Sequence, residues 1–452
     1  MLSLGKLAPG QQQYYLDTVA RGAEEYYTGA KEAPGQWVGR SAERLGLRGE
    51  VDPDVLHRIL EGADPTTGQP LTRTQGAPSV PGFDATFCAP KSVSLLYSLG
   101  APETSNEVRN AHDAAVGATF KLLEQVAARA RRGKGGSERI EADGLVAASF
   151  RHRTSRAGDP HLHTHVLVAN VVHAPSDGRW SALDARPLYA WAKTAGYLYE
   201  AQLRTELTRR LGLEWQAPRN GISDLAGVPS EAVRAFSTRR QQIEAHLARV
   251  GEKGPRASQV AAYATRAPKE TGSGPEVSRA EWVTRAQAHG LELGDLEALL
   301  YRTMPTDLPA PGSDAAHALF ERLANPDGLT SQHATFGRRE VLRAVAEALP
   351  PGADVEPICV LADAFLASGH VIGIREASGL RTSDVIRRRD GTVVPTRTDE
   401  ALWTTREILD VEDRLTTAAI QRRREGTGVA ARSAIDQALV ARPELSRCLL
   451  YT

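Results

Sequence analysis

Apolar and polar positions alternate in two neighbouring segments of the chain, residues 144–155 and 161–172. Alternation with a period of two is typical of a half-buried strand, because successive side chains point to opposite faces. The sequence RAGDP lies between the segments and is typical of a turn. The pattern therefore predicts an antiparallel hairpin. A third strand-like run opens residues 82–100, which are expected to turn at Pro90 and continue as a short helix.

Longer periods predict helices on both sides of the hairpin. In residues 107–132, apolar positions recur at three- and four-residue steps, at Ala111, Ala115, Ala118, Leu122 and Val126. Residues 11–28 predict a helix interrupted near Gly22, and the chain is mainly helical from residue 186 onward. There, residues 230–251 predict one helix that ends at a glycine and has one apolar face, made of Val233, Phe236, Ile243 and Leu247.

The order of these elements predicts an α+β fold with a central antiparallel sheet, flanking helices and a helical flap. A chain of 452 residues suggests roughly two or three domains. The stretch 303–314 is rich in proline, glycine, serine and threonine, so we expect a linker there. The expected parts are a main domain at 1–302, with a helical portion at 186–302, and a smaller C-terminal α/β region at 315–452.

Composition narrows the class of protein. Lys and Arg number 55, as do Asp and Glu, so net charge alone neither favours nor excludes a nucleic-acid partner. Three cysteines, far apart, argue against a disulfide framework. No long apolar run occurs, so we expect a cytoplasmic protein without a membrane span. The absence of a G-x-x-x-x-G-K-[ST] phosphate loop argues against an ATP-driven motor in this chain.

Four of the 12 histidines are concentrated in the segment FRHRTSRAGDPHLHTHVLVANVV, residues 150–172. His161, His163 and His165 share one strand face, but at about 3.3 Å per residue the outer two lie roughly 13 Å apart. Bonds of about 2 Å to one ion do not easily span that distance. His163 and His165 converge easily, and the paired strand brings His152 opposite them. The sequence predicts a metal site of these three, with ordinary surface or core histidines as the alternative.

Three neutral imidazoles would hold one divalent cation and leave positions open for a substrate. The residues do not choose among Mg, Mn, Zn and Ni. Asp84 follows on a strand with Thr86 and Cys88 on its face, and such a carboxylate commonly fixes the tautomer of a metal-bound histidine. A helix start after Pro90, together with Lys91, favours a phosphate. The alternatives are a solvent-edge aspartate and a plain capped helix.

Two tyrosine doublets stand near the start of the chain, in QQQYYLDTVARGAEEYYTG. Tyrosines usually pack on helices, yet four of the 11 in the chain are paired here: Tyr14, Tyr15, Tyr26 and Tyr27. Beside a metal that polarises a phosphate, a phenolic oxygen can attack phosphorus and retain a covalent phosphodiester. Such a step is a reversible strand transfer.

Taken together, these motifs resemble the relaxase domain of MobF-class (TrwC/TraI-like) conjugative relaxases of the HUH endonuclease superfamily. The resemblance covers roughly residues 1–300 and rests on pieces in family order: the tyrosine doublets, FDATFCAPKSVSL, FRHRTSRAGDPHLHTH, AGYLYEAQLRTEL and FSTRRQQIE. It implies an HUH relaxase fold. Residues 315–440 resemble the region that leads into a helicase in the family, although this chain carries no phosphate loop.

The resemblance also implies roles for individual residues. His152, His163 and His165 match the metal ligands, and Asp84 matches the acid that orients a ligand histidine. Tyr14 matches the nucleophile that attacks the scissile phosphate at the transfer origin, giving a 5′-phosphotyrosine and a free 3′-hydroxyl. Tyr26 matches the tyrosine of a second transfer. The ten residues between the doublets leave Tyr15 and Tyr27 open as replacements for their neighbours.

The expected partner is single-stranded DNA beside a hairpin at a transfer origin, together with relaxosome and secretion coupling proteins. Basic residues would contact phosphates, and the candidates are Lys91, Arg129, Arg131, Arg132, Arg151, Arg153, Arg156, Arg239 and Arg240. For most of these a solvated helix face is the alternative. The protein is expected to act as a monomer.

Three other functions remain open from the sequence. One is a replication initiator or transposase of the same superfamily, against which the early position of the tyrosines argues. Another is a three-histidine metallohydrolase, in which water attacks phosphorus and the tyrosines only pack. The last is a non-catalytic module that binds the hairpin of a transfer origin.

Overall fold

The structure of the protein is a computed structural model. It describes residues 1–8, 34–72, 78–133, 138–155, 157–251, 279–303, 308–375, 400–423 and 431–441, with five single positions between 254 and 265 and two short strands at 385–387 and 393–395. All structural statements below concern these residues.

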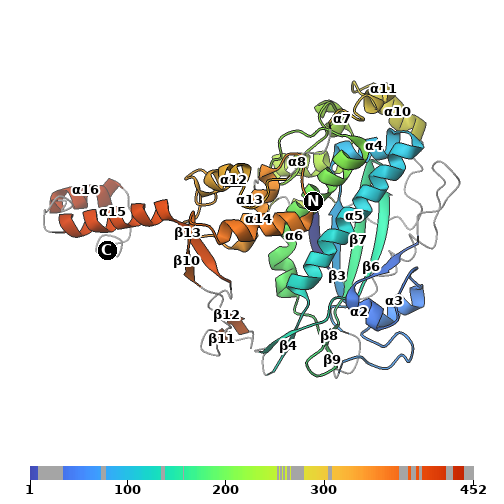
Figure 1. The fold of residues 1–452 in the computed structure, drawn as a ribbon, viewed down its shortest axis with the longest axis horizontal. Coiled ribbons are helices and arrows are strands. Elements are labelled where there is room, and N and C mark those ends of the chain that lie inside the picture. Colours follow the sequence, from blue (N-terminus) through green and yellow to red (C-terminus); the bar gives the residue numbers. More distant parts are fainter. Residues whose placement is uncertain are drawn as a thin grey trace.

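A five-stranded antiparallel sheet forms the centre of the molecule (Figure 1). Its strands, in spatial order, are β1 (Leu2–Lys6), β3 (Gly82–Cys88), β7 (Pro160–Ala169), β6 (Ala147–Thr154) and β2 (Gln36–Val38). Strands β6 and β7 pair directly across the RAGDP turn. The α+β fold with a central antiparallel sheet is therefore confirmed, and so is the hairpin.

Long helices cover one face of this sheet. They are α4 (Lys91–Leu99), α5 (Pro102–Ala127) and α6 (Ala185–Leu211), and they lie along the strands in Figure 1. Alternation along the strands directs a large set of apolar side chains into this layer, including Phe83, Phe87, Leu162, Val166 and Val168. We call this the covered face.

At one end of the opposite face, two short helices of the described chain cover the sheet, α2 (Arg40–Arg44) and α3 (Pro53–Leu60). Leu56 and Ile59 of α3 pack there against Phe150 and Leu167 of the sheet. The histidines follow on the same face toward the β6–β7 turn, because His152 is two residues beyond Phe150 and opposite His163. We call this the open face.

The predicted helix at 107–132 is too long at its C-terminal end. Helix α5 ends at Ala127, and Arg129–Arg132 instead form strand β4, paired with β5 (Glu138–Glu141). Ala130 is fully buried while its neighbours face outward, which is the two-residue period of a strand. A second ribbon, β8 (Val172–Ala174) with β9 (Arg179–Ser181), lies beside it.

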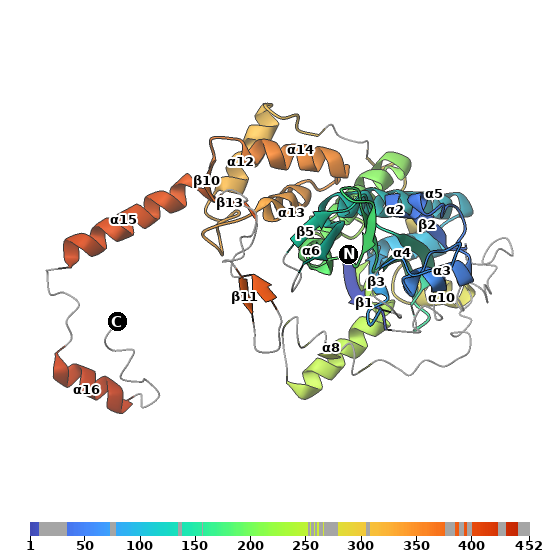
Figure 2. The same ribbon diagram turned by 90° about the horizontal axis from the view of Figure 1, so that it is seen from below.

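The single helix predicted at 230–251 is two helices, α7 (Ser230–Ala235) and α8 (Thr238–Val250). The chain breaks where Phe236 enters the core, and none of the α8 side chains is buried. Gly251 ends α8 with a φ of 71°, as expected. Figure 2 shows α8 projecting from the body, and α10 (Arg279–Gln287) and α11 (Leu293–Glu297) complete the helical part.

Beyond the predicted linker lie α12 (Asp314–Ala324), α13 (Arg338–Ala348), α14 (Val355–Leu366), and the ribbon of β10 (Val371–Arg375) with β13 (Leu402–Thr405). Helices α12–α14 share a core with Leu198 and Ala201 of α6. The guanidinium of Arg204, 1% exposed, donates to the carbonyl oxygens of Ala346 and Leu349. The C-terminal helices are thus fastened to α6.

The remaining strands and helices follow this ribbon or lie within its connection. The short hairpin of β11 (Val385–Arg387) and β12 (Val393–Pro395) lies between β10 and β13 in sequence. Helices α15 (Arg406–Arg422) and α16 (Arg432–Ala441) extend away from the body in both ribbon views. Among the residues described, no helix is both long and apolar enough to cross a membrane.

Candidate metal centre and active site

The three histidines predicted as metal ligands meet on the open face. The register of β6 and β7 places His152 directly opposite His163. The ring centroids of His152, His163 and His165 form a nearly equilateral triangle, with separations of 5.2 Å, 5.2 Å and 5.1 Å. Three imidazoles bound to one tetrahedral ion at about 2.1 Å would place their ring centres roughly 5 Å apart. The spacing is that of a shared cation site.

Hydrogen bonds orient two of these rings. His165 Nδ1 lies 2.9 Å from each carboxylate oxygen of Asp84, and Thr86 Oγ1 lies 3.1 Å from both His165 Nδ1 and Asp84 Oδ1. His163 Nδ1 donates to the carbonyl oxygen of His161 over 2.8 Å. A proton held on Nδ1 leaves the lone pair of each ring on Nε2, the tautomer that a metal ligand needs.

The third ring supplies an observation that tests whether a cation fits. His152 Nε2 is buried and has no hydrogen-bond partner among the described residues. Because a buried polar atom without a partner is energetically unfavourable, a ligand such as a cation is expected there. As placed, the donor atoms of the described residues form no ready-made group of three metal ligands. Terminal ring torsions of histidine rotate easily, so turning the rings on fixed centres would bring the nitrogens together. His152, His163 and His165 therefore fit a bound divalent cation.

The protonation of the rings agrees with this interpretation. Burial lowers the pKa of His152 well below its ordinary value, and the neighbouring His163 and His165 lower it further. Burial also lowers the pKa of His163 to about 4. Both rings are therefore neutral at pH 7, which is the form that binds a cation.

His161, which the sequence leaves out of the predicted ligand set, lies beside this triangle. Its ring stacks on that of His163, with centroids 4.7 Å apart and an interplanar angle of 27°. Burial, followed by the charge of His163, lowers the pKa of His161 to about 2. The backbone carbonyl oxygen of His161, which accepts from His163 Nδ1, helps to orient the ring of His163.

Several predicted site residues fall outside the described part of the chain. All four tyrosines, Tyr14, Tyr15, Tyr26 and Tyr27, lie there, and so does Arg156. Their roles stay predictions. Residues 34–38 and β1, which flank the tyrosine segment, lie at the edges of the central sheet.

Two of the predicted DNA-contacting residues, Arg151 and Arg153, lie on strand β6 of the hairpin. Arg151 forms an ion pair with Asp113 of α5, on the covered face and away from His152. The pairing of β6 with β7 is irregular between His152 and Thr154, so strand alternation does not place the side chain of Arg153. Arg151 does not share the face of the three histidines.

The other predicted basic contacts lie on β4, α4 and α8. On β4, Arg129 pairs with Glu141 and Arg132 with Asp177. Lys91 Nζ donates to the carbonyl oxygen of Pro160 over 2.5 Å, and burial lowers the pKa of this lysine to about 8. On α8, Arg239 donates to the backbone oxygen and hydroxyl of Thr265, while Arg240 pairs with Glu244 over 2.6 Å. Arg240 lies on the exposed surface of the projecting helix.

Sequence reasoning missed two buried polar groups beside the site. His112 is fully buried and bridges the hydroxyls of Tyr199 and Thr164, on the face of β7 opposite His163 and His165. The sequence indicates Asp159 only as part of a turn, yet its side chain is 2% exposed and bonds to α8 and α10. The only signal in the sequence was an aspartate placed before proline at the turn.

Comparison with known proteins identifies the family. The family model described as TrwC relaxase matches residues 8–289, which is more than half of the chain. The chain belongs to the TrwC relaxase family. A solved structure of the conjugative relaxase TrwC with oriT DNA, in a metal-bound form, covers 65% of this chain and 100% of its own, with 33% identity and a TM-score of 0.56. TrwC with a 27-mer DNA comprising the recognition hairpin and cleavage site gives 32% identity and a TM-score of 0.54.

Two curated relatives extend the similarity beyond the central sheet. The multifunctional conjugation protein TraI of Escherichia coli is 32% identical over 403 residues, 85% of this chain. The protein of the same name from Escherichia coli strain K12 is 34% identical over 370 residues. The chain spans only 22% and 20% of the length of these relatives.

Proposed function

We propose that this chain, a relaxase of the TrwC family, cuts one strand of DNA at a transfer origin and rejoins it by a metal-dependent transesterification. The observation that carries the proposal is the triangle of His152, His163 and His165 on the open face. The orientation of two of its rings by Asp84 and by a backbone carbonyl supports it further. TrwC structures with oriT DNA support the substrate class.

The three histidines are proposed to hold one divalent cation, and the metal-bound form of TrwC supports a cation in the family. When bound, that cation would act as a Lewis acid on a non-bridging oxygen of the scissile phosphate. Asp84 and Thr86 hold the ring of His165 and keep its proton on Nδ1. Burial keeps His163 unprotonated, so that no proton competes for its Nε2.

The proposed nucleophile is Tyr14, with Tyr15 as the alternative in the same doublet. Its phenolic oxygen forms a bond to phosphorus, the bond from phosphorus to the 3′ oxygen breaks, and the departing oxygen takes up a proton to become a 3′-hydroxyl. The phenolic proton is lost to solvent or a base. The number of phosphodiester bonds is conserved, so the reverse step rejoins the strand. Tyr26, or its neighbour Tyr27, is proposed for a second transfer.

The proposed DNA contacts combine the hairpin and the helical part. Arg240 on the exposed side of α8 and Arg239 beside it are proposed to contact the phosphate backbone. Lys91, Arg151, Arg153 and Arg156 are the further candidates near the β6–β7 hairpin. The proposed partner is single-stranded DNA next to a hairpin, with relaxosome and secretion coupling proteins as further partners.

The test is the formation of a covalent DNA adduct. Single-stranded oligonucleotides tiled across the transfer origin of the host element are incubated with the protein and Mn²⁺ or Mg²⁺, and the products are run on a denaturing gel. We expect an adduct that chelation by EDTA abolishes and that Tyr14→Phe removes without loss of DNA binding. Tyr301→Phe is the matched control, because Tyr301 is 76% exposed.

Each other outcome has a definite meaning. An undiminished adduct in Tyr14→Phe would remove Tyr14 from the nucleophile role. Metal-dependent cutting without any adduct would support the three-histidine hydrolase instead. Tight binding without cutting, with either metal, would support a non-catalytic module that binds the hairpin of the origin.

A further inference from the structure

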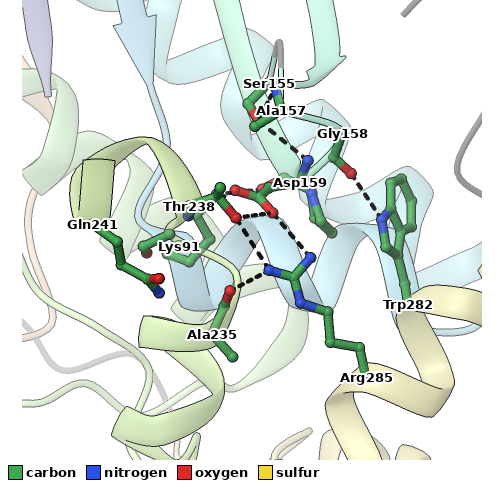
Figure 3. A network of polar contacts seen from close by, with 12 residues as sticks. Lys91, Ser155, Ala157, Gly158, Asp159, Ala235, Thr238, Gln241, Trp282 and Arg285 are labelled. Carbon is green, nitrogen blue, oxygen red and sulfur yellow. Dashed lines mark hydrogen bonds and ion pairs between the residues drawn. The ribbon is translucent and has the colours of Figure 1, made fainter. Parts of the chain in front are cut away.

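The turn between the two metal-binding strands is the centre of a buried polar network (Figure 3). Asp159, the residue before Pro160 at the start of β7, is 1% exposed. Its backbone N–H donates to Ser155 Oγ, and its carbonyl oxygen accepts from the Ser155 N–H, so the turn is closed on itself. The carboxylate points out of the turn, toward the helical part of the chain.

This carboxylate caps a helix that lies 79 residues further along the chain. The N-cap residue of α8, Ser237, makes no capping bond with its side chain. Instead Asp159 Oδ2 accepts from the Thr238 N–H over 2.9 Å, and Oδ1 accepts from Thr238 Oγ1 over 3.0 Å. A negative charge at this position also complements the positive end of the helix dipole. The cap of α8 is therefore supplied by the metal-binding hairpin.

A second helix joins the same carboxylate. Arg285 of α10 donates through Nη1 to Asp159 Oδ1 over 3.2 Å, and its Nη2 donates to the Ala235 carbonyl oxygen and to Thr238 Oγ1. The guanidinium lies 4.5 Å from the centre of the Phe236 ring. Trp282 Nε1 donates to the Gly158 carbonyl oxygen over 3.0 Å. Helices α7, α8 and α10 thus converge on one turn.

Helix α8 is attached to this junction at its start. Along its 13 positions no side chain is fully buried, and its most specific described contacts lie in the first turn. That turn is held through Thr238, and Arg239 reaches Thr265. The bonds to Asp159 therefore connect the start of α8 directly to the turn between the strands of His152 and His163.

We propose that Asp159 is a positioning residue that aims α8, with its arginines, at DNA held over the three histidines. The inference rests on the proposed function, because it assigns the outward side of α8 to the DNA. It makes Asp159 neither a metal ligand nor a group that touches the reacting phosphate. Loss of the Asp159 carboxylate should therefore lower the affinity for DNA more than it slows the chemical step.

The first variant is Asp159→Asn, which keeps the size of the side chain but removes its charge and one acceptor. We expect the Kd for a single-stranded oligonucleotide that extends past the cut site to rise about tenfold, because charge-assisted bonds at the junction are lost. We expect kcat at saturating DNA and the affinity for Mn²⁺ to stay within about twofold, since His152 and His163 are held by strand pairing. Asp177→Asn is the matched control, because Asp177 also pairs with an arginine but lies on the β8–β9 ribbon.

The second variant separates aiming from simple capping. Adding Ser237→Asp to Asp159→Asn gives α8 a cap from its own chain. Hydrogen exchange should then show the α8 amides protected again, while the weak DNA affinity persists because the tie to the hairpin is still missing. Recovery of DNA affinity in this double variant would overturn the proposal, since any cap would then suffice.

Other outcomes are also decisive. An unchanged Kd in Asp159→Asn would overturn the proposal, and so would a parallel fall in Mn²⁺ affinity and kcat. If Asp159→Asn does not fold, Thr238→Val tests the same junction by removing one hydroxyl, with a smaller rise in Kd expected. If the wild-type protein forms no adduct with any oligonucleotide, the proposed function fails. In that case, faster hydrogen exchange of the α8 amides in Asp159→Asn would still show that Asp159 stabilises the start of α8.

Discussion

In the first part of strand β7, the two faces carry different kinds of residue. On the covered face, Leu162 and Val166 are almost fully buried under α4–α6. On the open face, His163 and His165 meet His152 from the neighbouring strand. Both sets are held by the same backbone hydrogen bonds, because alternate residues of one strand point in opposite directions. The strand therefore places its packing and its chemistry on alternate residues.

This separation means that adjacent residues should respond differently to the same change. A truncation on the covered face removes volume from a close-packed core, which lowers stability. A truncation on the open face removes a ligand from the candidate metal centre and leaves the core intact. The five predictions below test that contrast, beginning with the largest effect.

His163→Ala should abolish both adduct formation and Mn²⁺ binding, since it removes one corner of the triangle. The free energy of unfolding should fall less than in Leu162→Ala, because His163 belongs to neither apolar cluster that packs on the sheet. Adduct gels, calorimetric titration with Mn²⁺ and urea unfolding measure the three quantities. His289→Ala, at an exposed position on the helical part, is the control. A large loss of stability would contradict the separation of the two faces.

Leu162→Ala should give the reverse result one residue earlier. Leu162 is fully buried in the covered layer, so its truncation should lower the free energy of unfolding by about 2–5 kcal/mol. Mn²⁺ affinity per folded molecule should be retained. Urea unfolding measures the loss, with Leu415→Ala as a control, because Leu415 is 65% exposed. Loss of the cation site in a still-folded Leu162→Ala would show that the faces are coupled.

Asp84→Asn should weaken the open face without removing a ligand. The carboxylate holds Nδ1 of His165, and losing such a partner typically lowers metal affinity roughly 10–100-fold. Mn²⁺ titration measures the affinity, and adduct formation should recover at high Mn²⁺. Asp64→Asn is a control, because Asp64 lies in an exposed turn and bonds to Thr66 and Thr67 there. Unchanged affinity would place Asp84 outside the metal centre.

Thr164→Val should disturb the covered face from a position between two ligands. The Thr164 hydroxyl bonds to the fully buried His112, and its removal leaves a buried ring nitrogen unsatisfied, at a cost of about 1–3 kcal/mol. Urea unfolding measures this cost, with Thr284→Val on the exposed side of α10 as control. Mn²⁺ affinity should not change, and a fall would show strain passing through the strand.

Lys91→Met should alter the pH dependence of stability. Burial lowers the pKa of Lys91 from 10.5 to about 8, so between these values the unfolded chain holds a proton that the folded chain has lost. The free energy of unfolding gains a contribution as pH rises from about 8 to about 10.5, and this contribution is absent below that window. Urea unfolding of both proteins at about pH 8, 9 and 10 should show a steeper rise for the wild type. Parallel curves would mean that the lysine is solvated.

The features that the sequence predicted correctly are local or repeat with a short period. The β6–β7 hairpin follows from alternation around a turn, and the convergence of His152, His163 and His165 follows from strand geometry. The sequence and the family resemblance predicted that Asp84 orients a ligand histidine, without indicating which one. In the structure the carboxylate of Asp84 lies 2.9 Å from Nδ1 of His165.

The features that the sequence missed depend on distant contacts. Arg129–Arg132 look like the end of a helix until they pair with β5, and α8 reads as a continuation of α7 until Phe236 enters the core. The capping role of Asp159 needs Thr238 and Arg285, which are 79 and 126 residues away. No periodic pattern records such contacts, because each is made once.

The 27-residue helix α6 is shared between two bodies, with one flank against the central sheet and the other against α12–α14. Removing the chain beyond the 303–314 stretch would therefore not leave an independently packed domain. The truncation would expose apolar side chains of α6 to water, and it would leave the guanidinium of Arg204 without its two carbonyl acceptors. Because α6 belongs to both apolar cores, a force applied to the C-terminal helices is transmitted through α6 to β1.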